Sequence, residues 1–240
     1  MKKIIYLLSL SVFAFVGCEE DNPEPDNPDD SNNSTTVTPQ FAGADGTLVA
    51  VRTKSGVGPF AITTGVGVAV FSDNGDFTNP VDAGDVSVNG TALVRGDNNA
   101  YYSIPGIANP TGVNFNNGVD WAVSGSADVN AFTYSPAQRN FPGVNGINGA
   151  AVVSKSSDYT LSANSITDAD SVVFMVQDVL VTTEGTTTTY TFTAAELANI
   201  ATGAGIVQVV GYNYETQTID GKNYYFVKET VLTQFVTIEE

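Results

Sequence analysis

The chain has 240 residues, of which 26 are acidic and nine are basic, so its formal charge is −17. That charge disfavours nucleic acid as a partner, because phosphate backbones are bound mainly through Lys and Arg. The sequence contains no histidine. Its absence excludes the Ser-His-Asp triad, histidine ligands to a metal and the commonest general base.

The first residues have the pattern of an export signal. Met1-Lys2-Lys3 is positively charged, and the stretch from Ile4 to Val16 is apolar and is followed by the small residue Gly17. The apolar run is shorter than the roughly 20 residues that a helix needs to cross a bilayer. We therefore expect residues 1–17 to be a signal peptide that is removed.

Phe15-Val16-Gly17-Cys18 resembles the bacterial lipobox, although Phe15 stands where that motif prefers Leu. The resemblance implies cleavage between Gly17 and Cys18, addition of diacylglycerol to the thiol of Cys18, and acylation of its new amino group. Several buried acyl chains give a stable membrane anchor. Cys18 is the single cysteine of the chain, so no thiol remains for a disulfide or a cysteine site.

Residues 18–40 have no apolar pattern and are rich in Asp, Glu, Asn and Pro. Such a segment is expected to be an extended, disordered tether. Glu19, Glu20 and Asp21 resemble the surface-export signal of Bacteroidota lipoproteins, whereas in enteric bacteria acidic residues here would indicate retention at the inner membrane. We expect an outer-membrane location facing the exterior. Loss of residues 1–17 takes the formal charge from −17 to −19.

From Phe41 onward the sequence has short apolar runs or alternations bounded by Gly, Asn, Asp and Pro, which is typical of β-strands. We predict an all-β, antiparallel sandwich. Residues 41–155 would form an N-terminal β domain with long loops, and residues 156–240 a second β domain, unless both form one continuous domain. The expected strands are 47–53, 65–71, 86–95, 100–104, 119–124, 150–154, 159–162, 171–183, 186–193, 206–218 and 222–238.

Turn and capping signals organise the C-terminal third. Asp220-Gly221 and Glu184-Gly185 each separate two strand patterns, and each has the composition of a tight hairpin turn. Residues 193–196 form a Thr-Ala-Ala-Glu capping box that predicts one short crossover helix, ended by Gly203.

The order strand, short helix, strand, Asp-Gly hairpin, strand from Tyr190 to Ile238 resembles the end of an immunoglobulin or fibronectin type III sandwich. The resemblance implies an immunoglobulin-like C-terminal part. Ile206-Val207 stands where that fold has its corner tyrosine, and the cysteine pair is absent.

A carboxylate pair is the remaining option for catalysis. Glu184 is explained by a turn and Glu196 by the capping box, and Glu215 and Glu229 are expected on a solvated sheet face. We predict no enzyme and no cofactor, with a carboxylate-dependent glycoside hydrolase as one alternative. The available residues are Asp120, Asp128, Glu184, Glu196, Glu215 and Glu229.

Aromatic residues are candidate ligand contacts. Trp121 alternates with polar neighbours in a way that places it in the core. Each of the pairs Tyr101-Tyr102 and Tyr224-Tyr225 must direct one ring away from the core side of its strand, which makes these four tyrosines candidate ligand-facing residues.

Acidic residues also offer oxygens for calcium. Asp73-Asn74-Gly75-Asp76, Asp168 and Asp170 could supply them, but none matches the twelve-residue calcium loop. We predict no metal site.

Together these features predict a non-catalytic, lipid-anchored binding or interaction module whose loops bind a glycan or an envelope protein. A structural spacer or coat lipoprotein is the other alternative.

Overall fold

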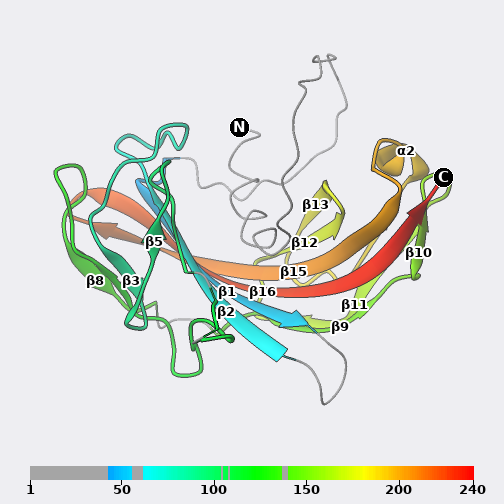
Figure 1. Ribbon diagram of the computed structural model, residues 1–240, viewed down its shortest axis with the longest axis horizontal. Coiled ribbons are helices and arrows are strands. Elements are labelled where there is room, and N and C mark those ends of the chain that lie inside the picture. The colour runs from blue at the N-terminus through cyan, green and yellow to red at the C-terminus, as the bar shows by residue number, and fades with distance from the viewer. Residues whose placement is uncertain (1–42, 56–61, 104, 108, 137–139) are drawn as a thin grey trace.

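The fold is organised around one strongly bent sheet (Figure 1). The computed structural model describes residues 43–55, 62–103, 105–107, 109–136 and 140–240. The sheet has nine strands in the order β13-β12-β15-β16-β1-β2-β6-β5, with β10 beside β16. Their bounds are β1 Gly46–Ser55, β2 Ile62–Phe71, β5 Val94–Arg95, β6 Tyr101–Tyr102, β10 Val152–Ser154, β12 Ser171–Val176, β13 Val179–Glu184, β15 Gly203–Ile219 and β16 Lys222–Glu239.

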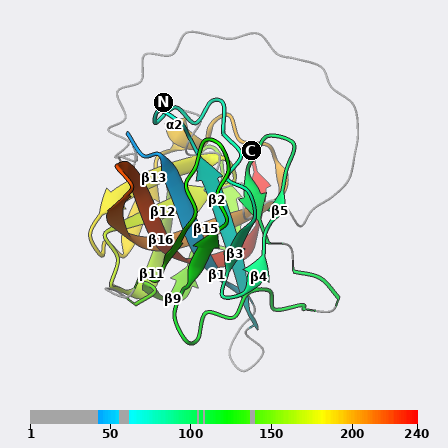
Figure 2. The same cartoon turned by 90° about the vertical axis from the view of Figure 1, so that its left-hand side faces the viewer.

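Two smaller sheets pack on this large sheet. One has three strands in the order β14-β11-β9, and the other has four in the order β4-β3-β7-β8. Figure 2 looks at the end of the molecule that carries β3 and β4. The bounds are β3 Val86–Val88, β4 Thr91–Ala92, β7 Trp121–Val123, β8 Phe132–Tyr134, β9 Gly143–Asn148, β11 Tyr159–Thr167 and β14 Thr189–Phe192.

Both small sheets cover the same face of the large sheet. Side chains alternate between faces along β16, and Phe226 packs in one core with the four-stranded sheet while Val236 packs in another with the three-stranded sheet. Val227 and Val231 point to the opposite side and belong to a third cluster. In Figure 1, β15 and β16 are bowed, and β9 and β11 of the three-stranded sheet lie beneath them on the outer side of the bow. We call the covered side the convex face and the side of Val227 and Val231 the concave face.

The longest strands, β15 and β16, form the predicted Asp-Gly hairpin. Their antiparallel pairing runs without interruption from Gly203 opposite Ile238 to Ile219 opposite Lys222. Asp220 and Gly221 between them have φ angles of 50° and 79°, as a primed two-residue turn requires. This hairpin prediction is confirmed.

The second predicted hairpin is wrong. The turn falls earlier, at Gln177 and Asp178, where β12 and β13 pair within the large sheet. At Glu184-Gly185 the chain leaves that sheet, and β14 then pairs with β11 in the small one. A Glu-Gly pair fits a hairpin turn and a connection between two sheets equally well. Gly185 has a positive φ angle here, where the chain passes from one sheet to the other, as a tight turn would also require.

The predicted helix is present as α2, Ala194–Leu197, and its capping box is complete. The helix ends with Ala198 as its C-cap rather than at Gly203, which opens β15. Leu197 and Ile200 are buried in the core beneath the three-stranded sheet. Within the described ranges, no helix is long and apolar enough to cross a membrane.

The all-β sandwich prediction is confirmed. The order β14, α2, β15, β16 matches the expected one, with β14 in a small sheet and β15 and β16 in the large one. However, strands from both sides of the boundary expected near residue 155 share the large sheet, and β1 pairs with β16. The large sheet therefore contains strands from both sides of the expected boundary.

Candidate functional site

The residues of the proposed anchor lie outside the described part of the chain. These are Gly17 and Cys18 at the cleavage position and Glu19, Glu20 and Asp21 in the tether. Lipidation and export therefore stay predictions from the sequence.

The four candidate tyrosines divide as strand alternation requires. Tyr101 is buried, donates to Asp82 Oδ1 at 2.8 Å and accepts from Ala83 N at 2.9 Å. Tyr224 is also buried, and its ring lies 4.7 Å from that of Phe132. These two rings belong to the core and do not face a ligand.

Their neighbours lie on the concave face. Tyr102 is 37 % exposed. Tyr225 is half-buried and its ring lies 5.7 Å from that of Tyr214. Tyr102 and Tyr225 are thus the two candidate aromatics that solvent can reach.

Trp121 is in the core, as predicted. Val119, Trp121 and Val123 are all buried in the cluster beneath the four-stranded sheet. The indole is therefore closed to a sugar ring.

The six candidate carboxylates do not assemble into a catalytic pair. Asp120 accepts a hydrogen bond from the Ser135 hydroxyl, and Asp128 lies on an exposed loop. Glu196 is held by the capping box, where its Oε2 accepts from Thr193 N at 2.8 Å. Glu184 is exposed at the end of β13.

Glu215 and Glu229 lie on opposite faces of the sheet. Glu215 is opposite Phe226 on the convex side, whereas Glu229 is opposite Tyr212 on the concave side. The expectation that both occupy a solvated face is wrong for Glu229, which is only 2 % exposed. The two carboxylates cannot act on one bond, because the sheet separates them.

The candidate calcium residues at 73–76 are held by hydrogen bonds of their own turn and by Lys222. In the turn at residues 73–76, Asn74 Oδ1 accepts from Asp76 N, and Asp73 accepts from Lys222 Nζ at 3.1 Å. No group of three acidic, cysteine or histidine residues arranged for a metal occurs within the described ranges.

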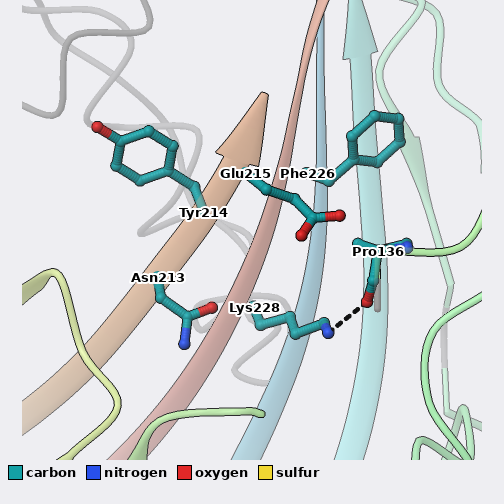
Figure 3. A pocket seen from close by; sticks show the side chains of 6 residues that line it. All are labelled: Pro136, Asn213, Tyr214, Glu215, Phe226 and Lys228. Atoms are coloured by element: carbon teal, nitrogen blue, oxygen red, sulfur yellow. Dashed lines mark hydrogen bonds between the residues drawn. The ribbon is translucent and has the colours of Figure 1, made fainter. Parts of the chain in front are cut away.

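A small recess on the convex face brings together charged residues from several strands (Figure 3). It lies on β15 and β16 beside Pro136. Figure 3 shows the side chain of Tyr214 pointing away from the other five. The lining residues are Pro136, Asn213, Tyr214, Glu215, Phe226 and Lys228.

The polar groups of this recess hold loops to the sheet. Lys228 Nζ donates to Pro136 O at 2.5 Å, and Asn213 Nδ2 donates to Asn140 O at 2.8 Å. Glu215 Oε1 accepts from Tyr134 Oη at 2.9 Å, and the Tyr134 ring packs 4.2 Å from that of Phe226. These hydrogen bonds tie Tyr134, Pro136 and Asn140 to the large sheet.

Burial sets the electrostatics here. Desolvation lowers the pKa of Lys228, while nearby Glu215 raises it and nearby Arg52 lowers it. Desolvation also lowers the pKa of Arg52, whose guanidinium donates to Phe115 O at 2.6 Å and lies 3.9 Å from the centre of the Phe141 ring. The recess thus holds an ammonium and a carboxylate whose main contacts are structural.

The centre of the concave face carries a second polar arrangement. Tyr212 and Glu229 are cross-strand neighbours, and they are 1 % and 2 % exposed. Glu229 Oε2 and Tyr212 Oη have no hydrogen-bond partner of standard geometry among the described residues. Burial raises the pKa of Glu229 to about 8 and that of Tyr212 to about 12. The nearby Ser171 hydroxyl lowers the pKa of Tyr212 and offsets part of this rise.

Reasoning from the sequence missed Arg52, Tyr134, Tyr212 and Lys228. For Glu229, a signal was present. Val227, Glu229 and Val231 alternate with Lys228 and Thr230, so the carboxylate shares a face with valines.

Fold and sites define an all-β sandwich protein with a bent central sheet. A scan against protein-family models finds no match to the chain, and a search of curated proteins finds no similar sequence.

Proposed function

We propose that this chain is a lipoprotein anchored through Cys18 in the outer membrane, where its β-sandwich faces the exterior as a non-catalytic binding module. The observation that carries the proposal is Phe15-Val16-Gly17-Cys18, followed directly by acidic residues. The tether of residues 18–40 leads into a body whose first strand begins at Gly46. Such a segment holds a folded domain away from its membrane.

The placement of the carboxylates supports binding over hydrolysis. Glycoside hydrolysis needs two carboxyl groups about 5 to 10 Å apart on one site. Glu215 and Glu229 are on opposite faces, and Asp120, Glu196 and Glu215 each accept hydrogen bonds that explain their positions. A glycan or another envelope protein is the proposed partner.

Metabolic labelling with radioactive palmitate tests the anchor. The wild-type chain should take up label and the Cys18→Ser variant should not. A matched Ser11→Ala variant, altered within the signal peptide but not at the cysteine, should label like wild type. Equal labelling of wild type and Cys18→Ser would overturn the anchor.

Protease treatment of intact cells tests the orientation. A protein facing the exterior should be degraded without lysis, while a periplasmic control protein stays intact. Protection until lysis would overturn the surface location. Pull-down from native envelopes, with the Cys18→Ser protein as bait, then tests partner binding.

A further inference from the structure

Five Asn-Gly pairs occur in the chain, and this dipeptide is prone to lose its side-chain amide. The backbone nitrogen of the glycine attacks Cγ of the asparagine and expels ammonia, which leaves a five-membered succinimide ring. Water then opens the ring at one of its two carbonyl carbons and gives aspartate or isoaspartate. Glycine favours ring closure because it has no side chain and adopts many backbone conformations. The pairs are Asn74-Gly75, Asn89-Gly90, Asn117-Gly118, Asn145-Gly146 and Asn148-Gly149.

Two of these asparagines lie in β9 and are held by side chains of β11. Asn145 Nδ2 donates to Ser165 Oγ at 3.2 Å, and Asn148 Nδ2 donates to Asn164 Oδ1 at 2.8 Å. The two strands also pair antiparallel through their backbones. To reach the geometry of attack, each asparagine must give up its side-chain hydrogen bond, which slows the reaction by about two- to tenfold.

Two others lie in turns whose hydrogen bonds fix the asparagine side chain. Asn74 Oδ1 accepts from Asp76 N at 3.1 Å. Asn89 Nδ2 donates to both Asn114 O and Gly118 O, at 2.7 and 2.9 Å. The same restraint on attack therefore applies to these two asparagines.

Asn117 is the exception among the five. Its side chain is exposed and makes no hydrogen bond with any described residue. Gly118 N donates to Phe115 O over 3.3 Å, which is longer than the usual range for such a bond. A methyl group at Gly118 would meet no atom within 4 Å. The two reacting groups can therefore approach each other without losing a strong contact.

Isoaspartate at this position would alter a loop that Asn89 holds. The backbone of isoaspartate contains one additional carbon, which lengthens the chain by about 1.5 Å. That carbon would lie between Asn114 and Gly118, the two residues whose carbonyl oxygens accept from Asn89 Nδ2. Asn89 Oδ1 also accepts from Asp120 N at 2.7 Å. A longer segment displaces the two carbonyl oxygens relative to this single amide nitrogen, so the contacts with Asn89 weaken.

We propose that Asn117 is a site of spontaneous deamidation, at which Gly118 N displaces ammonia from Asn117 Cγ and hydrolysis of the succinimide gives isoaspartate that loosens the loop from Asn89. One water molecule is consumed and one ammonia is released. The peptide bond to Gly118 moves from the main-chain carbonyl to the side-chain carbonyl, and the reaction needs no oxidant. The inference goes beyond the proposed function and holds whatever the protein binds.

Peptide mass spectrometry of the purified chain, incubated at pH 9, tests the proposal. Trypsin separates Asn117 from the other four pairs, because it cleaves after Arg95 and Arg139. Fragmentation of the peptides locates each converted residue and distinguishes isoaspartate from aspartate. We expect Asn117 to convert about two- to tenfold faster than each of the other four. Conversion at Asn117 that is no faster than at the others would overturn the proposal.

Two controls separate the effect of the fold from that of sequence. In concentrated urea the protecting hydrogen bonds are lost, so the five pairs should convert at similar rates. The same preference for Asn117 in folded and unfolded chains would mean that the structure does not select it. Asn117→Gln keeps an exposed amide whose attack needs a larger ring, so fast conversion in this peptide should disappear. Fast conversion that persists in the variant would place the reaction at another residue.

Urea unfolding tests the effect on the loop. The isoaspartate form, isolated by ion exchange, is compared with Asn117→Asp, which has the same added charge and an ordinary backbone. The isoaspartate form should unfold at a lower urea concentration, whereas Asn117→Asp should unfold like wild type. Equal midpoints for the two would contradict the loosened contact with Asn89.

Discussion

Lys228 and Glu229 are adjacent in β16, and the sheet places them in opposite environments. Lys228 points to the convex face, where its ammonium donates to Pro136 O. Glu229 points to the concave face among valines and opposite Tyr212. The charges of these neighbours therefore do not compensate each other, and the carboxyl group experiences desolvation as the main influence on its pKa.

Glu229 should make the protein less stable as the pH rises. Its pKa is about 8 in the folded chain and near 4.5 when unfolded, so between these values the unfolded state loses a proton that the folded state keeps. Stability from this group is therefore highest below about pH 4.5 and is lost as the pH rises to about 8, by on the order of 5 kcal/mol.

Urea unfolding of wild type and Glu229→Gln at pH 5 and pH 8.5 measures this effect. The variant should lose less stability between the two pH values than wild type does. An equal loss in the two proteins would mean that Glu229 is ionised in the folded state. Glu184→Gln, at an exposed position, is the control and should behave like wild type.

Trp121→Ala should destabilise the fold by about 3 to 5 kcal/mol, because it opens a cavity beneath the four-stranded sheet. Chemical unfolding followed by circular dichroism measures the loss. Tyr102→Ala, on the exposed side of β6, should cost under about 1 kcal/mol. Since Trp121 is the single tryptophan of the chain, its emission in wild type should shift to longer wavelength on unfolding. Emission typical of exposed indole in the folded protein would contradict its burial.

The hydrogen bond from Tyr134 to Glu215 should couple the two residues. In a double-mutant cycle with Tyr134→Phe and Glu215→Gln, we expect a coupling of about 1 kcal/mol. The free energy of unfolding of the four proteins gives this value. Additive effects would show that Tyr134 is held to the large sheet by its ring packing on Phe226 of β16 and not by the hydrogen bond to β15.

Gly221→Ala should lower the free energy of unfolding by about 1 kcal/mol. A methyl group at this position has open space around it, so the cost comes from the φ angle of 79° and not from a clash. Gly106→Ala, also in open space but without a positive φ angle, serves as the control and should change stability by under about 0.5 kcal/mol. Thermal unfolding of both variants provides the comparison.

Much of the sandwich is predictable from local signals. The β15–β16 hairpin follows from Asp220-Gly221, the α2 cap from Thr193 and Glu196, and the burial of Trp121 from alternation. Each depends on residues close in sequence, and those interactions are the ones that pattern and turn chemistry report.

Relations between distant strands were not predictable in the same way. At Glu184 the chain leaves the large sheet, because β14 pairs with β11 and not with β13. Phe192 of β14 then packs in the core beneath the three-stranded sheet. The recess likewise joins Pro136 to Lys228, 92 positions apart. For Glu229, polar neighbours suggested a solvated face, although the spacing of Val227 and Val231 already favoured an apolar one.

The parallel pairing of β1 with β16 affects the order in which the protein can fold. Gly46 to Lys54 align with Tyr224 to Leu232, so β1, which pairs with β2 on its other side, reaches β16 only when nearly the whole chain is present. Contacts this distant in sequence slow folding, because the chain must close a long loop first. If the chain is exported N-terminus first, Cys18 would cross the membrane before β16 could pair with β1 in the central sheet. Truncation within β16 should leave β1 paired with β2 alone.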